Sequence, residues 1–468
     1  MLIEIAGVPG EILCKCPENE LFFKDYVSDK EPLFVVNPVE EDLQRIQASC
    51  DQMNEAAGFP RRQRSEVFLE NSAIRAGLVE KLTEHDVILF DILRACLFTG
   101  EDVDLPDWQP VFDEMKQQTV AGLPGDWLES HLNADPWMSY CRIQQGKWVR
   151  LMYAQDQLLQ LLEANDIPCV ILKGAAAAMA YPNPTLRLMG DIDFLVKRCD
   201  FEKTAALLEA NGYSLGREKN PKSHHYGYSK NRVTFELHRR LPVIVESDER
   251  RLTYFEQGID AREWHETEGH RFPVFPVTLN GLVLIFHINQ HLRTGLGLRQ
   301  IIDWMMYVHT LPTEKWEELL PLINSTGHDR LARTVTLLCQ RYLGLEKIVE
   351  EDASLPVEDL LNYILEKGNF GKKAGIDGKI AIVGLFSTRK HGYFSRLQAG
   401  GMKRWKAAKK HAILRPFAWM FQAARLLGIV VKNKKSPAQI LKHSRHGANQ
   451  RQMLEKLGLG LERTIPQK

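Results

Sequence analysis

The sequence predicts an α+β fold in which strands and helices alternate between two largely helical regions. Three observations lead to this prediction. Apolar residues recur at helical spacing before residue 165 and again after residue 278. Between them, short runs rich in β-branched and aromatic residues are separated by helix-forming runs and by Gly and Pro breaks. At 468 residues, with 44% hydrophobic and 26% charged residues, the chain has the length and composition of a globular protein of two or three domains.

The N-terminal part divides into two expected segments. Residues 1–105 form an accessory region with short β-type runs, such as LFFKDYV at 21–27, followed by helical patterns. Residues 106–165 form a helical lead-in, in which Leu158, Leu161 and Leu162 share one apolar face. The segment NDIP at 165–168 then ends the helix.

Residues 166–277 are the expected core, where the secondary structure alternates. The helix that follows the first strand is favoured by its alanines, and the two prolines of YPNPT at 181–185 end it. Asp200 is the expected N-cap of the next helix, and Gly212 is expected just beyond its end. In chain order, the predicted elements are a strand at 169–172 (CVIL), a helix at 175–180 (AAAAMA), a strand at 191–196 (DIDFLV), a helix at 201–210 (FEKTAALLEA) and a strand at 232–238 (RVTFELH).

The C-terminal part is expected to be helical throughout, with a domain at 278–375 and a basic region at 376–468. No Asp or Glu occurs between Gly378 and Leu454, whereas Lys and Arg recur. This charge bias suggests a peripheral contact with an anionic surface, either lipid or an anionic acceptor, and nucleic acid would rest on charge alone. The run at 413–431 is apolar enough for a membrane interface, but its two arginines and its proline argue against a membrane span.

Several classes of protein are disfavoured by what the sequence lacks. The formal net charge is zero, so bulk charge predicts no partner. The eight cysteines show no paired CxxC spacing and are typical of reduced core residues. The sequence has no signal-peptide pattern, no apolar run of membrane-spanning length and no GxxxxGK[ST] phosphate-binding loop. A cytoplasmic protein without a transmembrane segment is therefore the expectation.

Two aspartates at the start of a predicted strand are the main indication of chemistry. Asp191 and Asp193 point to the same face of a strand, with Cα atoms roughly 6.5 Å apart, and they repel each other unless a cation lies between them. Glu236 would complete the group if its strand lies beside theirs. Carboxylate ligands suit Mg²⁺ or Mn²⁺ rather than zinc, and such ions can support phosphoryl transfer.

Residues around this acidic group are candidates for binding a nucleotide and a second substrate. Gly174 and Ala175 stand where a helix begins, and backbone amides there favour a phosphate. Lys173 and Arg187 are available to meet the charge of a triphosphate, although ordinary surface pairing explains them equally well. Two histidines are further candidates for substrate contact, one in a predicted loop and one on the strand of Glu236: His225 and His238.

His287 and His291 are spaced by one helical turn, as in zinc-binding HxxxH pairs. The glutamate of the protease motif HExxH is missing, and the flanking LVLIF indicates a buried helix. Structural histidines are therefore the expected interpretation.

Together these motifs resemble the uncharacterised nucleotidyltransferase family of the DNA polymerase β-like superfamily, over roughly residues 110–310. The resemblance implies a small mixed β-sheet flanked by helices, with Asp191, Asp193 and Glu236 as metal ligands. It also implies transfer of a nucleoside monophosphate from ATP or another NTP to a hydroxyl-type acceptor, with release of pyrophosphate. The motifs that carry it are ILKG at 171–174, GDIDFLV at 190–196, NGY at 211–213 and FELH at 235–238.

One departure from the family pattern concerns the phosphate-binding turn. The wider superfamily usually has Gly-Ser where this chain has Gly174 and Ala175, so a hydroxyl contact to phosphate is missing. The region of residues 1–105 also resembles the leading strands of HPr-kinase-like proteins, but without the phosphate-binding loop we expect no kinase activity.

Two other functions fit the same residues. A DxD glycosyltransferase also holds a nucleotide through one metal, but its carboxylates usually follow an apolar strand, whereas here Phe194, Leu195 and Val196 come after them. A catalytically degenerate fold that acts as a binding module would fit Ala175, but the intact carboxylates speak against it.

Overall fold

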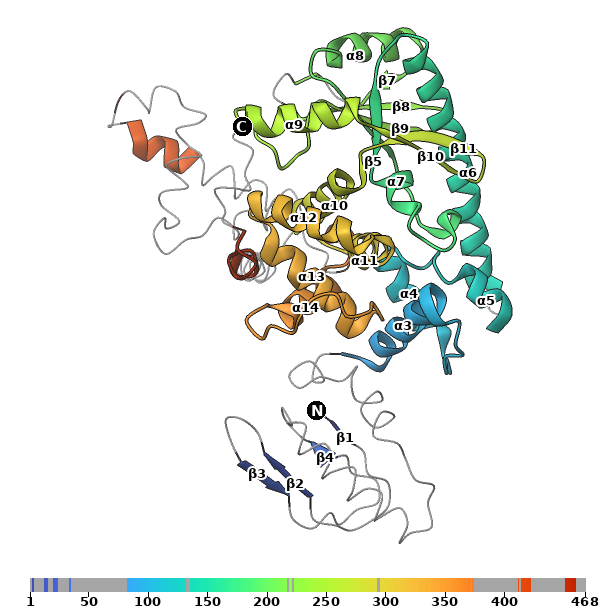
Figure 1. The fold of residues 1–468 in the computed structure, drawn as a ribbon, viewed down its shortest axis with the longest axis vertical. Helices are drawn as coiled ribbons and strands as arrows, with labels where there is room; N and C mark the ends of the chain where they lie inside the picture. The colour runs from blue at the N-terminus through green and yellow to red at the C-terminus, as the bar shows by residue number, and fades with distance from the viewer. Residues whose placement is uncertain are drawn as a thin grey trace. The chain divides into compact units, whose positions relative to one another are not determined.

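The computed structural model describes most of the chain between residues 82 and 371 and parts of its ends (Figure 1). The chain divides into two compact units, residues 1–111 with 340–345 and residues 112–339 with 346–468. The described residues are 82–131, 135–216, 219–220, 223–292, 295–371, 373, 411, 414–421 and 451–459, with the backbone of four short strands near the N-terminus.

The first unit contains two small strand pairs and a helix. Strand β1 (Leu2–Ile3) pairs with β4 (Leu33–Phe34), and β2 (Ile12–Lys15) pairs with β3 (Glu20–Phe23), both antiparallel. Helix α3 (Glu84–Arg94) starts at a capping box formed by Thr83 and Asp86 and continues into a π-helical turn, η1 (Ala95–Thr99). Most residues on which the HPr-kinase-like resemblance rests lie outside the described part of the chain.

The second unit is built around one five-stranded sheet, which confirms the predicted α+β class and the small mixed sheet. Its strand order is β5-β6-β9-β8-β7. The central pair β6–β9 is parallel and the other neighbouring pairs are antiparallel. The strands are β5 (Cys169–Leu172), β6 (Ile192–Val196), β7 (Ser214–Leu215), β8 (His225–Lys230) and β9 (Val233–His238).

One face of this sheet carries the hydrophobic core. Ile171, Phe194 and Phe235 point into it from three adjacent strands and are at most 1% exposed. Helix α6 (Asp135–Glu163) covers this face because its buried residues recur every three or four positions, from Trp137 to Leu162. The alternate side chains along each strand face the other way, and on β6 and β9 they include Asp193, Glu236 and His238.

The remaining elements surround the sheet or build the helical part of the chain (Figure 1). They are α4 (Trp108–Gln117), α5 (Gly125–His131), α7 (Gly174–Ala178), η2 (Pro184–Leu186), α8 (Phe201–Ala210), α9 (Glu249–Asp260), the antiparallel pair β10 (Glu263–Thr267) and β11 (His270–Val274), α10 (Val277–His291), α11 (Leu298–Thr310), α12 (Thr313–Ser325), α13 (Asp329–Tyr342), α14 (Val357–Lys367) and η3 (Asn369–Gly371).

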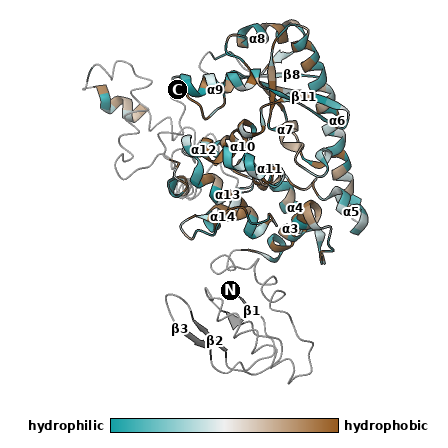
Figure 2. Ribbon diagram, viewed as in Figure 1, coloured by the Kyte–Doolittle hydropathy of each residue, from teal (hydrophilic) through white to brown (hydrophobic). Residues whose placement is uncertain are grey.

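Helix α8 carries both hydrophobic and hydrophilic residues, as Figure 2 shows, which is typical of an amphipathic helix. Gly212 follows it with φ +78°, as expected for a residue just beyond a helix end. The expected cap at Asp200 is wrong in one respect. Its side chain makes no capping hydrogen bond, and its backbone carbonyl instead accepts from the Thr204 amide.

The C-terminal predictions are covered only in part by the described residues. A short helix includes residues 415–421, and another includes 451–456. The basic runs between them, and most of the apolar run at 413–431, lie outside the described residues. Among the helices that the structure describes, none combines the length and the apolar character needed to cross a membrane.

Candidate active site

The pairing of β6 with β9 places two carboxylates side by side. In this parallel pair Asp193 lies opposite Glu236, and Leu172 of β5 lies on the other side of Asp193. Because side chains alternate along a strand, Asp193 and Glu236 point away from the core face that carries Phe194 and Phe235. The strand adjacency on which the prediction for Glu236 depended is therefore present.

Asp193 is the centre of a small network of charges. Its Oδ1 accepts from Lys173 Nζ at 2.9 Å and is 2.8 Å from His238 Nε2. The same nitrogen of His238 lies 3.3 Å from Glu236 Oε2. One ligand-type atom from each of Asp193, Glu236 and His238 falls within 4.8 Å of the others. This set, two carboxylates and an imidazole, has the donor chemistry to hold a divalent cation.

Asp191 precedes β6 and lies outside that group of three atoms, but it belongs to the same electrostatic cluster. Its pKa is raised to about 6, first by burial and then by the negative charges of Asp193 and Glu236. Lys173 and Arg299 oppose this increase. Burial and the neighbouring carboxylates thus disfavour the ionised form of Asp191, and a bound cation would favour it.

The balance is different at Asp193 itself. Burial alone would raise its pKa, but Lys173 and His238 hold it well below its usual range. Burial would likewise lower the pKa of Lys173, and the nearby carboxylates raise it instead. Both side chains therefore stay charged in the folded protein, although they lie in a low-dielectric environment.

Lys173 reaches Asp193 from a strained turn. Its φ of +51° is unusual for a residue other than glycine, and Gly174 follows with φ +32°. The turn leads into α7, which has only five residues, so its dipole is small and attraction of a phosphate would rest mainly on the backbone amides near Gly174. Ala175 is buried in the hydrophobic core cluster.

Arg187 has partners other than the phosphate we expected. It is 3% exposed, and its Nε and Nη2 donate to the two carboxylate oxygens of Asp303 at 2.9 and 2.6 Å. The Tyr181 hydroxyl donates to the same carboxylate at 2.8 Å. Asp303 is thus the partner that engages Arg187, and the guanidinium is not available to a nucleotide in this arrangement.

Arg299 is a cation of the site that the sequence did not reveal. It is the second residue of α11, and its charge opposes the increase in the pKa of Asp191. Its Nη1 donates to the Leu188 carbonyl at 3.1 Å, whereas its Nε is buried with no hydrogen-bond partner among the described residues. Burial first, and then repulsion by Arg187, lower its pKa. No motif marks it, because its place depends on how α11 packs.

The candidate histidines separate into two groups. His225, expected in a loop, is the first residue of β8, where strand pairing with His238 holds it. Its Nε2 lies 3.8 Å from Glu236 Oε1. His287 and His291 are buried on α10, as expected of structural histidines, and their rings touch with centroids 4.6 Å apart.

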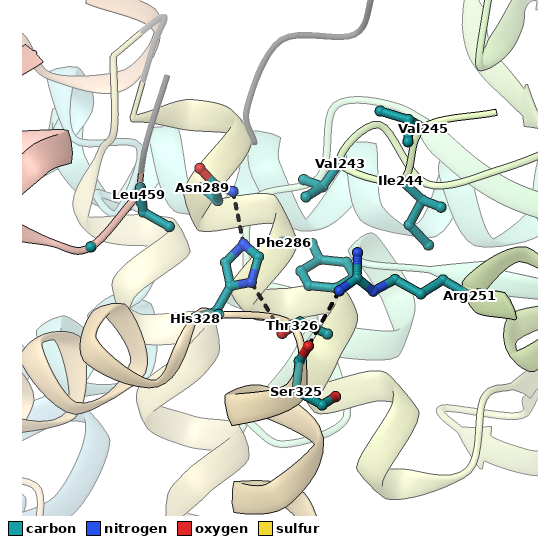
Figure 3. Close-up of a pocket in the computed structure, with 12 residues that line it drawn as sticks. Val243, Ile244, Val245, Arg251, Phe286, Asn289, Ser325, Thr326, His328 and Leu459 are labelled. Atoms are coloured by element: carbon teal, nitrogen blue, oxygen red, sulfur yellow. Dashed lines mark hydrogen bonds between the residues drawn. The ribbon is translucent and has the colours of Figure 1, made fainter. Parts of the chain in front are cut away.

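A cavity of about 370 Å³ lies elsewhere in the second unit (Figure 3). His328 bridges Asn289 and Thr326 on one side of it, and Arg251 donates to the Ser325 carbonyl. The residues that line the cavity include none of the three carboxylates, so it is separate from the charge cluster.

The small mixed sheet, with carboxylates on two adjacent strands beside a Lys-Gly turn, defines a nucleotidyltransferase-type core. The chain belongs to the uncharacterised nucleotidyltransferase family, whose family model matches residues 105–344. Family and fold together support nucleotidyl transfer as the general activity.

Two solved structures are similar to part of the chain at low sequence identity. The antibiotic-resistance factor ANT(2'')-Ia is 15% identical, over 37% of this chain and 92% of that one, with a TM-score of 0.27. An antigenic nucleotidyltransferase-like protein from Paracoccidioides brasiliensis is 17% identical, over 37% of this chain and 88% of that one, with a TM-score of 0.26. No curated protein matches the chain significantly. The family assignment therefore rests on the family model.

Proposed function

We propose that this chain is a metal-dependent nucleotidyltransferase that transfers a nucleoside monophosphate from an NTP to a hydroxyl-type acceptor. The observation that carries the proposal is the register of β6 and β9, which sets Asp193 beside Glu236 with Asp191 two residues before Asp193. In the reaction, the acceptor hydroxyl oxygen attacks the α-phosphorus of the NTP and gives up its proton to solvent. The bond between the α-phosphorus and the α,β-bridging oxygen breaks, and pyrophosphate leaves.

The donor set fits Mg²⁺ or Mn²⁺. Asp191, Asp193 and Glu236 offer carboxylate oxygens, and burial first, then the charges of Asp193 and Glu236, raise the pKa of Asp191. These three residues would hold the cation. When bound, it would neutralise phosphate charge and make the acceptor oxygen more reactive.

The chain's own cations would then bind the triphosphate. We assign this role to Lys173, whose ammonium group already lies among the carboxylates, and to Arg299, whose Nε lacks a partner among the described residues. The backbone at Gly174 and Ala175 offers amide donors to the phosphates. Arg187 has no part in this proposal, because its guanidinium is paired with Asp303.

The test is thermal unfolding of the purified chain with each of ATP, GTP, CTP and UTP, with and without Mg²⁺. A ligand at about 100 times its dissociation constant stabilises a fold by roughly 2.7 kcal/mol, which gives a measurable shift. We expect a magnesium-dependent shift with at least one NTP and its loss in Asp191→Asn. The matched control is Asp166→Asn, at an exposed carboxylate whose positive φ asparagine tolerates.

Other outcomes would identify a different function. A shift with nucleotide sugars alone would indicate a DxD glycosyltransferase. The absence of any shift would favour a degenerate binding module. Ala175 and the Lys173–Asp193 ion pair, which already occupies one carboxylate, would be consistent with that reading.

A further inference from the structure

Three histidines form a second group of potential metal ligands beside the carboxylates. They are His224, His225 and His238, and one ring nitrogen from each lies within 4.8 Å of the others. The group sits where the β8–β9 ladder ends. His225 opens β8 opposite His238, and the His224 carbonyl accepts from the Arg239 amide. Backbone hydrogen bonds of two strands therefore hold all three residues in place.

The rings are close enough to share one cation. The centroids of His224 and His225 are 4.4 Å apart, and the ring of His238 lies 5.2 Å from that of His225 and 5.8 Å from that of His224. His225 Nδ1 and His224 Nε2 are 2.8 Å apart, a distance that leaves room for one proton between them. One of these two nitrogens therefore donates and the other accepts, and a metal bound by both would replace this hydrogen bond.

His238 has the environment of a metal-binding histidine. It is 1% exposed, and its Nε2 contacts the Asp193 carboxylate. Its Nδ1 is buried and has no hydrogen-bond partner among the described residues. A carboxylate on one ring nitrogen commonly orients a histidine whose other nitrogen binds a metal. A buried ring nitrogen without a partner is also costly, so its retention calls for an explanation.

The charges that face the cluster are of both signs. Lys173 and Arg240 disfavour a further positive charge there, whereas Asp193 and Glu236 favour it. Burial would lower the pKa of His238, but its contacts with Asp193 and Glu236 raise it, so a metal that binds this ring displaces a proton.

We propose that His224, His225 and His238 form a metal site for a late first-row divalent cation of the zinc class, separate from the carboxylate site for Mg²⁺ or Mn²⁺. Imidazole nitrogens suit zinc, and carboxylates suit magnesium. Three protein ligands leave a fourth position open, as in zinc sites that bind water or a substrate atom. His238 belongs to both groups of ligand atoms, so occupancy of one site affects the other.

The experiment is a titration of the full chain after treatment with a chelator. Co²⁺ is added as an optical probe, because its visible absorption reports coordination by nitrogen ligands, and Zn²⁺ is then used to displace it. We expect one equivalent of Zn²⁺ to bind, and His224→Gln and His225→Gln each to weaken binding by about tenfold or more, with loss of the Co²⁺ band. His265→Gln, at a histidine of β10 outside the cluster, is the matched control and should bind as the wild type does.

Two results would overturn the proposal. One is Zn²⁺ binding that is equally weak in the wild type and in the double variant His224→Gln/His225→Gln. The other is binding that persists in the double variant but disappears in Asp191→Asn, which would place the cation on the carboxylates. Circular dichroism of each variant shows that it is folded, and both replaced histidines are partly exposed and so tolerant of glutamine. Because this readout requires no nucleotide, it can fail independently of the proposed activity.

Discussion

The second unit contains two clusters of buried charge, and they differ in how completely their aspartates are paired. Around Asp303, Arg187 supplies a bidentate ion pair and Tyr181 a third hydrogen bond, and the aspartate is 1% exposed. Around Asp193 the charges do not balance. Lys173 and His238 satisfy one carboxylate, but the pKa of the neighbouring Asp191 is raised to about 6.

The difference indicates which charges serve the fold and which serve a ligand. A buried ion pair with matched partners needs nothing further from outside the protein. A cluster is costly unless a ligand completes it when it holds an acid of raised pKa, Asp191, and buried polar atoms with no partner among the described residues, His238 Nδ1 and Arg299 Nε. We therefore regard the Asp303 cluster as structural and the Asp193 cluster as functional.

The largest expected effect on stability comes from breaking the ion pair of the Asp303 cluster. Asp303→Asn leaves the buried Arg187 guanidinium without a counter-charge, and removing one partner of a buried ion pair costs about 3 to 5 kcal/mol. Urea denaturation should show this loss in the free energy of unfolding. Asp166→Asn, on the surface, should change it by less than about 0.5 kcal/mol.

Nucleotide binding separates the two roles further. The folded fraction of Asp303→Asn should still show the magnesium-dependent shift with NTP. Loss of that shift without loss of stability would mean that Asp303 acts in nucleotide binding together with the Asp193 cluster. It would contradict the division into a structural and a functional cluster.

The next largest effect is a gain in stability, expected when Asp191 is replaced. The pKa of Asp191 is about 6 in the folded chain and 3.8 for an ordinary aspartate, so the folded state binds more protons between these values. The free energy of unfolding should therefore fall as pH rises from about 4 to 6, by roughly 2 kcal/mol. Asp191→Asn should remove this fall and stabilise the metal-free chain at pH 7.

Urea denaturation at several pH values between 4 and 7 measures this directly. The lowered pKa of Asp193 works in the other direction, since its stabilisation is lost only as pH falls below 3.8. The two windows do not overlap. A stability of Asp191→Asn equal to that of the wild type throughout would show that Asp191 is not strained by its neighbours.

The sequence contained enough information for the three strands that were predicted, but not for β8, where a loop was expected, or for all of the charges. Cys169–Leu172, Ile192–Val196 and Val233–His238 could be predicted because apolar and β-branched runs end at clear Gly, Pro or polar breaks. The parallel pairing that joins Asp193 to Glu236 could only be stated as a condition, since register depends on tertiary contacts.

Arg187 and Arg299 show why the charges around the site could not be predicted from the sequence. Arg187 stands four residues before Asp191 in the sequence, yet it turns to Asp303, 116 residues further along the chain. Arg299 lies more than 100 residues beyond Asp191 and Asp193 and nevertheless acts on the pKa of Asp191. Nearness in sequence favoured Arg187, but α11 supplies both its partner, Asp303, and the second arginine, Arg299, and the packing of this helix could not be read from the sequence.

A smaller effect, on NTP affinity, should follow from removing Arg299, the second cation beside the Asp193 cluster. If Arg299 binds the triphosphate, Arg299→Met removes a charge-assisted hydrogen bond worth about 1.5 to 3 kcal/mol, and NTP affinity should fall by about 10- to 100-fold. Titration calorimetry with the NTP identified by thermal shift measures it. Arg150→Met, exposed on α6, is the control. A change of less than about twofold in Arg299→Met would leave Lys173 as the site's phosphate ligand.

The smallest expected effect concerns the departure from the family's Gly-Ser turn. Ala175 is 1% exposed and packs in the hydrophobic cluster under β5 and β6, so a serine hydroxyl would enter an apolar environment. Ala175→Ser should therefore lower the free energy of unfolding by about 1 kcal/mol, the usual cost of a poorly satisfied buried hydroxyl, and leave NTP affinity within about twofold. Calorimetry and urea denaturation of the same preparation measure both. A tenfold gain in NTP affinity would instead show that the serine hydroxyl reaches a phosphate. The nucleotide site around the Asp193 cluster would then extend to the start of α7.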